Sequence, residues 1–579
     1  MTRGLKHIYH NRIAGYFNEV GIESQYSRVY TIRNFPGTKS HLSRMTVRDI
    51  AFALTAWYKH LGHVSNYFVS GRFRRTNIPR FYKPMTLSLE QNINRATELE
   101  RLLAAVAHRA VAYVAAADDL DARIGDPVPP KQLALILGSH LSLPNVGGGQ
   151  SEFLEVLDEI LRHSVVTWHP GFMDKLYAST NPVGVATDLL LSILNTNSYI
   201  YSVAPVLTLI EKRTSHEYAE LFGFTSPWSG GITLPGGSAS NTHSLVVART
   251  ILYPDTKVNG NGDYKFVIFT SCHGHYSVEK AAISLGLGSQ SVWTIPVDKD
   301  ERMRVEILEE KILEAKRQGY TPLYVNATAG TTVYGSFDPF EEIAVIAKKY
   351  GLWLHVDGSW GGNVVFSDKL RYKLKGVELA DSLTVNPHKM LGVPLTCSFL
   401  LAPDHRIFQK ASSLRAPYLY HSDATDGEDF DMGDSTMGCG RRADSLKLFL
   451  GWKWYGKDGY AKRVEQAFGV TAHLANLISN RPGFSLVSSN PPPCLQTCFY
   501  YSPRGDAMQN DAEYNTKITR AIAYELQASG RFLVDYAPPT EADGKGEFFR
   551  AVVNAPTTTM ETVEELVGAI ERIGKALEL

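Results

Sequence analysis

The sequence predicts an α/β protein whose large domain contains a mostly parallel central sheet, followed by a small C-terminal α+β domain. Between about residues 200 and 455, short apolar runs typical of strands alternate with segments of helical periodicity. The clearest example is a strand-like run at 322–326, an apolar stripe at helical spacing over 343–350, and a second strand-like run at 352–357. This order is that of a βαβ unit, which places its two strands parallel in one sheet.

The helix of this βαβ unit has recognisable ends. Asp338 is expected to be its N-cap, Pro339 its first helical residue and Glu341 the acid of a capping box. Gly351 follows the last apolar position. It is expected to end the helix, because glycine adopts the left-handed conformation of a helix C-terminus without strain.

Changes in pattern along the chain divide it into four regions. Residues 1–90 form an extension of unknown role, and residues 91–200 form an N-terminal helical segment. Residues 201–455 form the large α/β domain, and residues 456–579 form the small C-terminal domain. The proline cluster Pro491–Pro493 is expected to be a connection inside the last region.

The amino-terminal region bears on the location of the protein. Residues 1–48 are rich in Lys and Arg, and their acidic residues are only two glutamates. A mitochondrial transit segment, a docking extension and a tail without functional weight are all compatible with this composition. The region lacks the amphipathic regularity of a transit segment, so a cytoplasmic location is expected.

Composition argues against several classes of partner. The 579 residues contain 59 basic and 59 acidic side chains, so nothing in the net charge indicates nucleic acid or a membrane surface. The most apolar stretch, 102–117, is interrupted by His108 and Arg109 and is not expected to span a bilayer. Five cysteines lack paired metal-ligand spacing, which favours reduced, mostly buried thiols and no metal. They are Cys272, Cys397, Cys439, Cys494 and Cys498.

The tetrapeptide Asn386-Pro387-His388-Lys389 follows the apolar run 383–385 and contains the most informative residue of the chain. A lysine just past a buried strand, beside apolar walls and another potential cation, has its pKa lowered by desolvation and like-charge repulsion. Its amine can then attack an aldehyde, which is what an enzyme that uses pyridoxal 5'-phosphate (PLP) requires. The alternative is a solvated loop lysine.

Asp357 ends the strand-like run 352–357, about thirty residues before Lys389. Ligands of parallel α/β sheets bind at the carboxyl ends of strands, so both side chains are expected at one site. A carboxylate against the pyridine nitrogen of PLP keeps that nitrogen protonated, so that the ring can accept electrons. Asp357 could instead be a helix cap or turn residue, which the following Gly358-Ser359 would allow.

A turn of small residues at 236–240 precedes the helical stretch 244–251. Small residues let the backbone approach an anion, and the start of a helix offers unpaired N–H groups and the positive end of its dipole. A phosphate site is therefore expected here, although glycine-serine turns before helices are common.

A histidine-containing segment, Cys272–Ser277, follows the strand-like run 266–269. A histidine beside a planar cofactor can stack on the ring and help to position the substrate. The alternative is that His273 and His275 are ordinary core or surface residues.

From about residue 95 to its end, the chain resembles group II PLP-dependent amino acid decarboxylases. Within them it resembles the branch of glutamate, cysteine sulfinate and animal-type aspartate decarboxylases. The resemblance covers more than four-fifths of the sequence and rests on long ordered motifs. They include His169-Pro170, Asn195-Thr196-Asn197, the turn 236–241, the segment 327–332, the run 355–362, the loop 386–395, Cys439-Gly440-Arg441-Arg442 and Phe548-Phe549-Arg550.

The resemblance implies PLP fold type I, the aspartate aminotransferase type, with PLP bound by the large domain of a homodimer. It implies that Lys389 holds PLP covalently, that Asp357 pairs with the ring nitrogen and that His275 stacks on the ring. Tyr418 matches a catalytic-loop tyrosine that returns a proton to the substrate carbon, and 421–434 is expected to be a mobile lid. Further cofactor-binding residues implied by the resemblance are Ser238, Ala239, Ser240, Thr332, Ser359, Asn386 and His388.

The substrate expected from the resemblance is a small acidic amino acid, because Arg550 matches an arginine that binds the side-chain carboxylate. Lys175 stands where glutamate decarboxylases carry a glutamine, and we include its neighbours Leu176 and Tyr177 in the predicted substrate site. A longer, charged side chain favours a shorter acid, so conversion of aspartate to β-alanine is preferred over glutamate to GABA. Cysteine sulfinate is the alternative substrate, and an aromatic amino acid decarboxylase or an aminotransferase is less favoured. Lys175 could also point into solvent.

Overall fold

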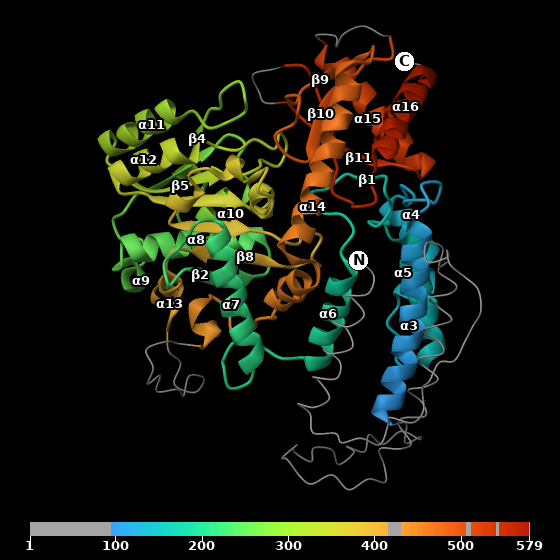
Figure 1. Ribbon diagram of the computed structural model, residues 1–579, viewed down its shortest axis with the longest axis horizontal. Coiled ribbons are helices and arrows are strands. Elements are labelled where there is room, and N and C mark those ends of the chain that lie inside the picture. The colour runs from blue at the N-terminus through green and yellow to red at the C-terminus, as the bar shows by residue number, and fades with distance from the viewer. Residues whose placement is uncertain (1–93, 415–429, 505–510, 540–543, 578–579) are drawn as a thin grey trace, which may run out of the picture. The chain divides into compact units, whose positions relative to one another are not determined.

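The computed structural model describes residues 94–414, 430–504, 511–539 and 544–577, and the predicted extension 1–90 lies outside them. Within these residues, seven strands form a large sheet in the order β2-β8-β7-β6-β5-β3-β4 (Figure 1). The strands are β2 (Gly230–Leu234), β3 (Phe266–Ser271), β4 (Val292–Ile295), β5 (Thr321–Thr328), β6 (Trp353–Gly358), β7 (Ser382–Val385) and β8 (Ser398–Ala402). Strands β3 to β7 are parallel, and β8 is antiparallel to both of its neighbours. The predicted mostly parallel sheet is confirmed.

Helices cover both faces of the large sheet. They are α7 (Pro205–Leu221), α8 (Gly237–Leu252), α9 (Thr256–Asn259), α10 (Ser277–Ser284), α11 (Val305–Arg317), α12 (Phe340–Tyr350) and α13 (Arg406–Ser412). Val267 and Phe269 of β3 join a core with α7, α11 and α12, whereas Phe266 and Ile268 join a core with α8, α10 and α13. This alternation explains why the strands read as nearly continuous apolar runs.

The described part of this region also contains five short 3₁₀ helices. They are η2 (Ser289–Ser291), η3 (Gly361–Phe366), η4 (Arg371–Leu374), η5 (Val377–Leu379) and η6 (Met432–Ser435).

The predicted βαβ unit is present as β5, α12 and β6. Gly351 ends α12 in the left-handed conformation, with φ 70°, as expected. The start of the helix differs from the prediction, because the helix begins at Phe340 and Pro339 is the residue before it. No side chain caps this end.

Asp338 is not the predicted N-cap. Its buried carboxylate accepts hydrogen bonds from the backbone N–H groups of Met303, at 2.7 Å, and Thr328, at 2.8 Å. These donors are also inside the protein and need an acceptor, so the carboxylate serves them instead of the helix. Burial raises the pKa of Asp338 to about 6. Glu341, predicted for the capping box, pairs with Lys375 at 2.8 Å.

Within the described residues, five strands form a second sheet in the order β1-β11-β12-β10-β9. They are β1 (Phe172–Met173), β9 (Phe484–Leu486), β10 (Gln496–Tyr501), β11 (Leu533–Ala537) and β12 (Phe548–Val552). Helices α14 (Ser445–Ser479), α15 (Ala512–Ser529) and α16 (Met560–Ala576) pack on it in one core. Strand β1 was not predicted from the sequence, and it brings the segment after residue 173 beside β11.

Helix α14 runs across the predicted boundary between the large and small domains. It is kinked at Gly456, where φ is 69° and ψ is 176°. Only glycine adopts this conformation without strain. The predicted boundary at 455/456 therefore coincides with a bend inside a single helical stretch.

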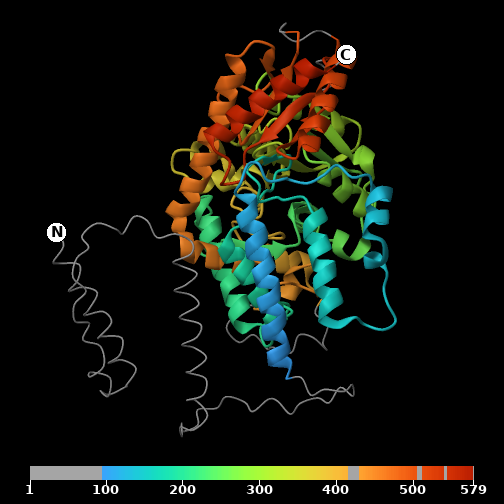
Figure 2. The same cartoon turned by 90° about the vertical axis from the view of Figure 1, so that its right-hand side faces the viewer.

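The N-terminal part of the described chain is helical, as predicted. It contains α3 (Arg95–Ala117), α4 (Pro130–Leu137), η1 (Gly138–Leu141), α5 (Gly149–His163) and α6 (Pro182–Leu194). Arg109 of α3 binds Asp158 of α5 through two hydrogen bonds, at 2.6 and 3.1 Å. Figure 2 shows α3, in blue, extending away from the red C-terminal elements. In the described part of the chain, none of the helices has the length and apolar character needed to cross a membrane.

Candidate active site

A cavity of about 240 Å³ lies where β3, β5, β6 and β7 end and α8 begins. Parallel strands place their carboxyl ends along one edge, so each strand-end loop contributes side chains to the same space. The lining residues are Gly237, Ser238, Asn241, His273, His275, Tyr276, Thr328, Gly330, Thr332, Asp357, Ser359, Trp360, Asn386, His388 and Lys389.

Lys389 lies in the loop after β7, and its side chain lines the cavity. The loop is held from inside, because the Asn363 side chain donates to the Asn386 carbonyl at 2.9 Å. Burial lowers the pKa of Lys389, and the charge of Asp357 opposes this effect. The predicted direction is therefore supported through desolvation, but the charge that acts on Lys389 is a carboxylate rather than the expected cation.

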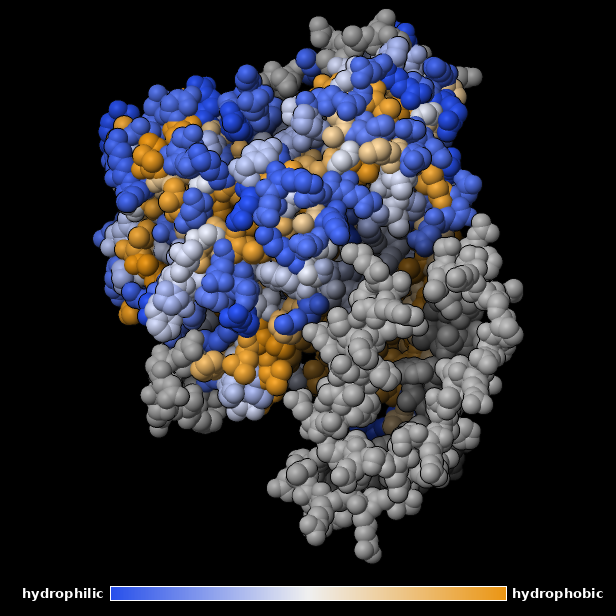
Figure 3. Space-filling model, viewed as in Figure 1, coloured by the Kyte–Doolittle hydropathy of each residue, from blue (hydrophilic) through white to orange (hydrophobic). Residues whose placement is uncertain are grey.

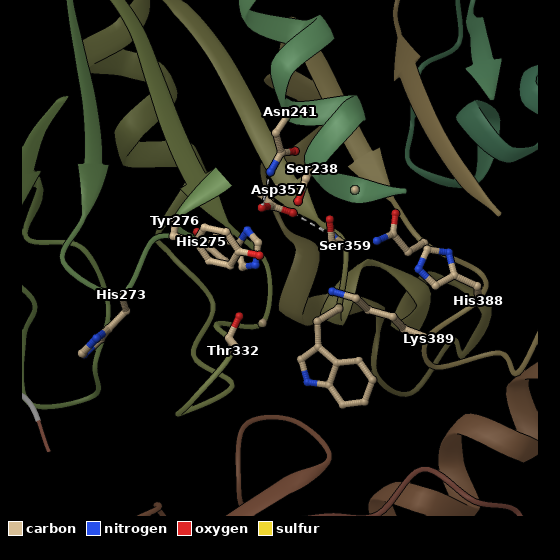
Figure 4. Close-up of a pocket in the computed structure, with 15 residues that line it drawn as sticks. Ser238, Asn241, His273, His275, Tyr276, Thr332, Asp357, Ser359, His388 and Lys389 are labelled. Atoms are coloured by element: carbon tan, nitrogen blue, oxygen red, sulfur yellow. Dashed lines mark hydrogen bonds between the residues drawn. The ribbon is translucent and has the colours of Figure 1, made fainter. Parts of the chain in front are cut away.

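Asp357 is the penultimate residue of β6 and is buried. Its carboxylate accepts a hydrogen bond from Asn241 Nδ2, at 2.7 Å, and one from the Ser359 N–H, at 3.0 Å (Figure 4). Burial raises the pKa of Asp357, but the charges of His275 and Lys389 and the Ser359 bond lower it more, so the net shift is downward. The carboxylate is suited to pair with a protonated ring nitrogen.

Asn241 is a site residue that the sequence analysis quoted only as part of a motif. Its Nδ2 also donates to Ser277 Oγ at 3.0 Å, and its Oδ1 lies 3.3 Å from His355 Nε2. The available signal was its spacing, because Asn241 stands four residues after Gly237 on one face of α8.

Of the two predicted histidines, His275 belongs to the centre of the site. Figure 4 shows His275 near Asp357, whereas His273 points away from both. His275 Nδ1 lies 2.8 Å from Ser277 Oγ, and burial lowers the pKa of its imidazole. An imidazole at this place can stack on a ring. His273 instead binds Glu301, with 2.6 Å between Nε2 and Oε2.

The start of α8 meets the requirements of a phosphate site. The first hydrogen bond into the helix comes from the Ser240 N–H to the Gly236 carbonyl, at 3.1 Å, so the N–H groups of 237–239 have no partner in the helix. Ser238 lines the cavity. The predicted Ala239 and Ser240 do not line it, and the Ser240 hydroxyl lies 2.8 Å from Ser398 Oγ.

Thr332, Ser359, Asn386 and His388, also predicted from the resemblance, all line the cavity. His388 Nδ1 lies 2.7 Å from the Cys397 carbonyl oxygen. Burial lowers the pKa of His388 to about 4, so its ring is neutral near neutral pH.

Two buried polar atoms of the lining, Thr328 Oγ1 and Asn386 Oδ1, have no hydrogen-bond partner among the residues that the structure describes. Such atoms are costly in an empty interior and indicate that a polar ligand completes the site. Together with the enclosed lysine, the aspartate and the start of α8, they fit the amine-reactive, ring-nitrogen and phosphate ends of PLP.

Arg550 lies on β12 and is 6% exposed. Its NH1 donates to the Thr332 carbonyl at 2.8 Å, which places the guanidinium next to a residue of the cavity lining. The guanidinium that is predicted to bind a substrate carboxylate already has a carboxylate partner, because its NH2 is paired with Asp535. Lys175 does not simply point into solvent, since its Nζ lies 3.1 Å from Asp535 Oδ2.

The remaining predicted substrate residues, Leu176 and Tyr177, differ in their burial. Leu176 is packed in the core of the large sheet, whereas Tyr177 is 37% exposed and contacts Phe172. Asn554, which the sequence analysis missed, connects this segment to the lysine loop. Its Nδ2 donates to the Leu176 carbonyl at 3.2 Å and to the Lys389 carbonyl at 3.1 Å.

The predicted catalytic-loop residue Tyr418 lies outside the described residues. Residues 421–434 are predicted to form a solvated lid. This prediction is wrong for the end of the segment that the structure describes, because residues 431–434 are buried. Asp431 accepts a hydrogen bond from the Tyr201 N–H at 2.9 Å, and the Gly433 N–H donates to the Tyr199 carbonyl at 2.7 Å. Both bonds attach this short stretch to the segment before α7.

A doubly wound sheet with an enclosed lysine and a buried aspartate on neighbouring strand ends, and a phosphate site at α8, defines a PLP-dependent enzyme of fold type I. Residues 139–502 match the pyridoxal-dependent decarboxylase conserved domain. The chain belongs to this decarboxylase family, and it is therefore a carboxy-lyase that uses PLP.

Known relatives cover most of the chain. An L-aspartate decarboxylase of Metarhizium robertsii is 50% identical over 501 residues, which are 83% of this chain and 98% of the relative. A glutamate decarboxylase-like protein of Gibberella zeae is 39% identical over 489 residues, 78% of this chain and 92% of the relative.

Solved structures share the fold. The crystal structure of mouse CSAD has a TM-score of 0.78 and 33% identity, over 84% of this chain and 100% of that chain. Oryza sativa TDC, solved with PLP and tryptamine, has a TM-score of 0.77 over 84% and 99% of the two chains. At 22% identity, this second likeness concerns the fold alone.

Proposed function

We propose that the protein removes the α-carboxylate of an acidic L-amino acid, with L-aspartate preferred over L-glutamate, and releases β-alanine and carbon dioxide. The observation that carries the proposal is the position of Arg550, whose guanidinium contacts the cavity-lining residue Thr332. A guanidinium beside the cavity favours a substrate with a second carboxylate, because it offers charge-assisted hydrogen bonds that an apolar side chain cannot accept. The half-identical L-aspartate decarboxylase of Metarhizium robertsii supports the preference for aspartate.

The chain's own residues have separate tasks in this reaction. When bound, PLP supplies the ring that accepts the electrons of the broken carbon–carbon bond. Lys389 holds the cofactor, and Asp357 keeps a proton on the ring nitrogen. Arg550 and Lys175 bind the side-chain carboxylate, which leaves the α-carboxylate as the reacting group. Tyr418, outside the described residues, is the proposed proton donor to the substrate carbon.

We also propose a homodimer, on the basis of an exposed apolar surface on α6 and α7. Side chains of α6 at positions that face outward are exposed by 41–55% although they are aliphatic. They are Val185, Leu189, Leu190 and Ile193, and α7 adds Val206 and Leu209. Figure 3 shows apolar side chains gathered at the lower middle of the molecule, over the region of α7. Surfaces of this kind mark interfaces with other proteins.

Parallel measurement of carbon dioxide release from L-aspartate, L-glutamate, cysteine sulfinate and L-tryptophan tests the function. We expect the highest kcat/KM with L-aspartate. The Lys389→Ala variant should release no carbon dioxide from any of the four substrates. Borohydride reduction followed by peptide mass mapping should find the cofactor on Lys389. Release from L-tryptophan alone would overturn the acidic substrate, and glutamate as the best substrate would overturn the preference. Sedimentation of a monomer at micromolar concentration would overturn the dimer.

A further inference from the structure

Asp535 lies between the two cations of the predicted substrate site. Its Oδ2 accepts a hydrogen bond from Lys175 Nζ at 3.1 Å, and the same oxygen is paired with NH2 of Arg550. The sheet fixes this arrangement, because β11 lies between β1 and β12. Asp535 is the direct cross-strand partner of Arg550.

The two cations differ in how deeply they are held. Arg550 is almost completely buried and donates to the carbonyl oxygens of Thr332, at 2.8 Å, and Asp174, at 3.2 Å. Its Nε is buried and has no partner among the described residues. The side chain of Lys175 is 48% exposed, and its ammonium also lies 3.2 Å from Asp174 Oδ1. A ligand can therefore reach Lys175 more easily than the arginine beneath it.

This difference bears on substrate length. A carboxylate on a short side chain can contact the exposed ammonium without having to meet the guanidinium in its full bidentate geometry. A longer side chain could reach the deeper guanidinium and would then depend less on Lys175. The location of the ammonium, which contacts both Asp535 and Asp174, would then discriminate between acids of different length.

We propose that Asp535 is a positioning residue that holds the Lys175 ammonium beside Arg550, so that both cations bind the side-chain carboxylate and favour a four-carbon over a five-carbon substrate. This inference rests on the proposed function. Asp535 acts through Lys175 and does not itself touch the substrate.

The Asp535→Asn variant tests the proposal, because it keeps the shape of the side chain and removes its charge. We expect the ratio of kcat/KM for L-aspartate to that for L-glutamate to fall about tenfold, mainly through KM for aspartate. Lys175→Gln should lower the ratio similarly. The double variant should lower it no further, since two residues that act through one contact are not additive.

Glu547→Gln is the matched control, because Glu547 comes just before β12 and its pair with Arg520 of α15, at 2.6 Å, lies outside the site. It should leave the ratio unchanged. Calorimetric binding of succinate and glutarate to the holoenzyme provides a readout apart from turnover. Asp535→Asn should weaken the binding of succinate about tenfold and the binding of glutarate much less.

The outcomes separate the two proposals. An unchanged ratio in Asp535→Asn or in Lys175→Gln, with a wild type active on L-aspartate, overturns the inference and leaves the proposed function intact. Full additivity in the double variant also overturns it. A wild type that releases carbon dioxide from no acidic amino acid overturns the proposed function instead. If Asp535→Asn loses its cofactor absorbance, an unchanged ratio in Lys175→Gln still overturns the proposal, because the ammonium that Asp535 holds would then have no part in selectivity.

Discussion

Asn241 Nδ2 donates a 2.7 Å hydrogen bond to Asp357 Oδ2, and it thereby ties the start of α8 to the end of β6. One side chain thus links the proposed phosphate end of the cofactor site to its proposed ring-nitrogen end. A second bond to Ser277 Oγ, at 3.0 Å, fixes the Asn241 amide from the other side.

We expect Asn241→Ala to weaken PLP retention about ten- to a hundredfold, because a buried carboxylate loses a charge-assisted hydrogen bond. The dissociation constant can be measured from cofactor absorbance after dialysis against increasing PLP. Thr242→Ala is the control, since the hydroxyl of the partly exposed Thr242 bonds its own helix backbone, at the Ser238 carbonyl. Retention as tight as in the wild type would contradict the role of Asn241.

The main catalytic candidates could be predicted from the sequence because each follows an apolar run that is long enough to recognise. Asp357 stands at the end of such a run, Lys389 and His275 lie in the loops that follow their strands, and parallel strands bring their ends together along one edge of the sheet. The family resemblance added Thr332 and Ser359, which line the cavity.

Other features depend on information that periodicity does not contain. Strand β1 has two residues, too few for an alternating pattern, yet it aligns Lys175 with β11. The pairing of Asp535 with Arg550 depends on the register of two strands. Asn554 connects the Leu176 segment to the Lys389 loop because tertiary packing places the two carbonyl groups within reach of its amide. Asp338 had the correct residue type for a cap, but buried N–H groups nearby compete for its carboxylate.

His243 should make the protein less stable in acid. Burial lowers the pKa of its imidazole to about 4, below its ordinary value. Between about pH 6.5 and 4 the unfolded chain therefore binds a proton that the folded protein resists, and the free energy of unfolding falls as pH decreases. A pKa shift of this size lowers the free energy of unfolding by about 3 kcal/mol at the acid end of this window. Asp338, with its pKa raised to about 6, works in the opposite direction, because its folded form binds the proton more readily.

Comparison of melting temperatures at pH 7.5 and 5 for the wild type and His243→Gln isolates this contribution. The glutamine amide can replace the donor of His243 Nε2, which lies 3.1 Å from the Ser435 carbonyl oxygen. We expect a smaller acid-induced decrease in the variant. His108→Gln changes an exposed histidine and should keep the wild-type decrease. Equal decreases in all three proteins would show that His243 is not responsible.

The buried ion pair between Arg441 and Glu211 should be costly to break from one side. Their side chains are 5% and 0% exposed, and Glu211 also accepts the Thr233 N–H at 2.8 Å. Arg441→Met leaves a buried carboxylate without its cation, so we expect a loss of about 3–5 kcal/mol in the free energy of unfolding. Denaturant titration measures this loss.

Glu217→Gln provides the comparison on the same helix, because Glu217 pairs with Arg213 on the surface. That exposed pair should contribute less than about 1 kcal/mol. Similar losses in Arg441→Met and Glu217→Gln would contradict the difference that burial predicts.

Gly237 allows the backbone at the start of α8 to approach the cofactor site closely. A Cβ atom at this position would lie 2.6 Å from both Asn386 Nδ2 and Ser359 Oγ. These distances are shorter than any van der Waals contact, so Gly237→Ala must displace two residues of the lining. We expect PLP to bind about tenfold more weakly, or worse, because overpacking of this kind costs on the order of 1–3 kcal/mol.

Removing one of the two obstructing atoms separates steric conflict from lost backbone freedom. Ser359→Ala deletes the hydroxyl and leaves the Asn386 amide in place, so the double variant Gly237→Ala/Ser359→Ala should recover part of the lost affinity. The dissociation constants of PLP for the two single variants and the double variant give the coupling directly. Recovery is expected only if the added methyl group meets Ser359. A double variant as weak as the sum of its parts would place the effect of Gly237 in the backbone of α8 rather than in the space beside the cofactor.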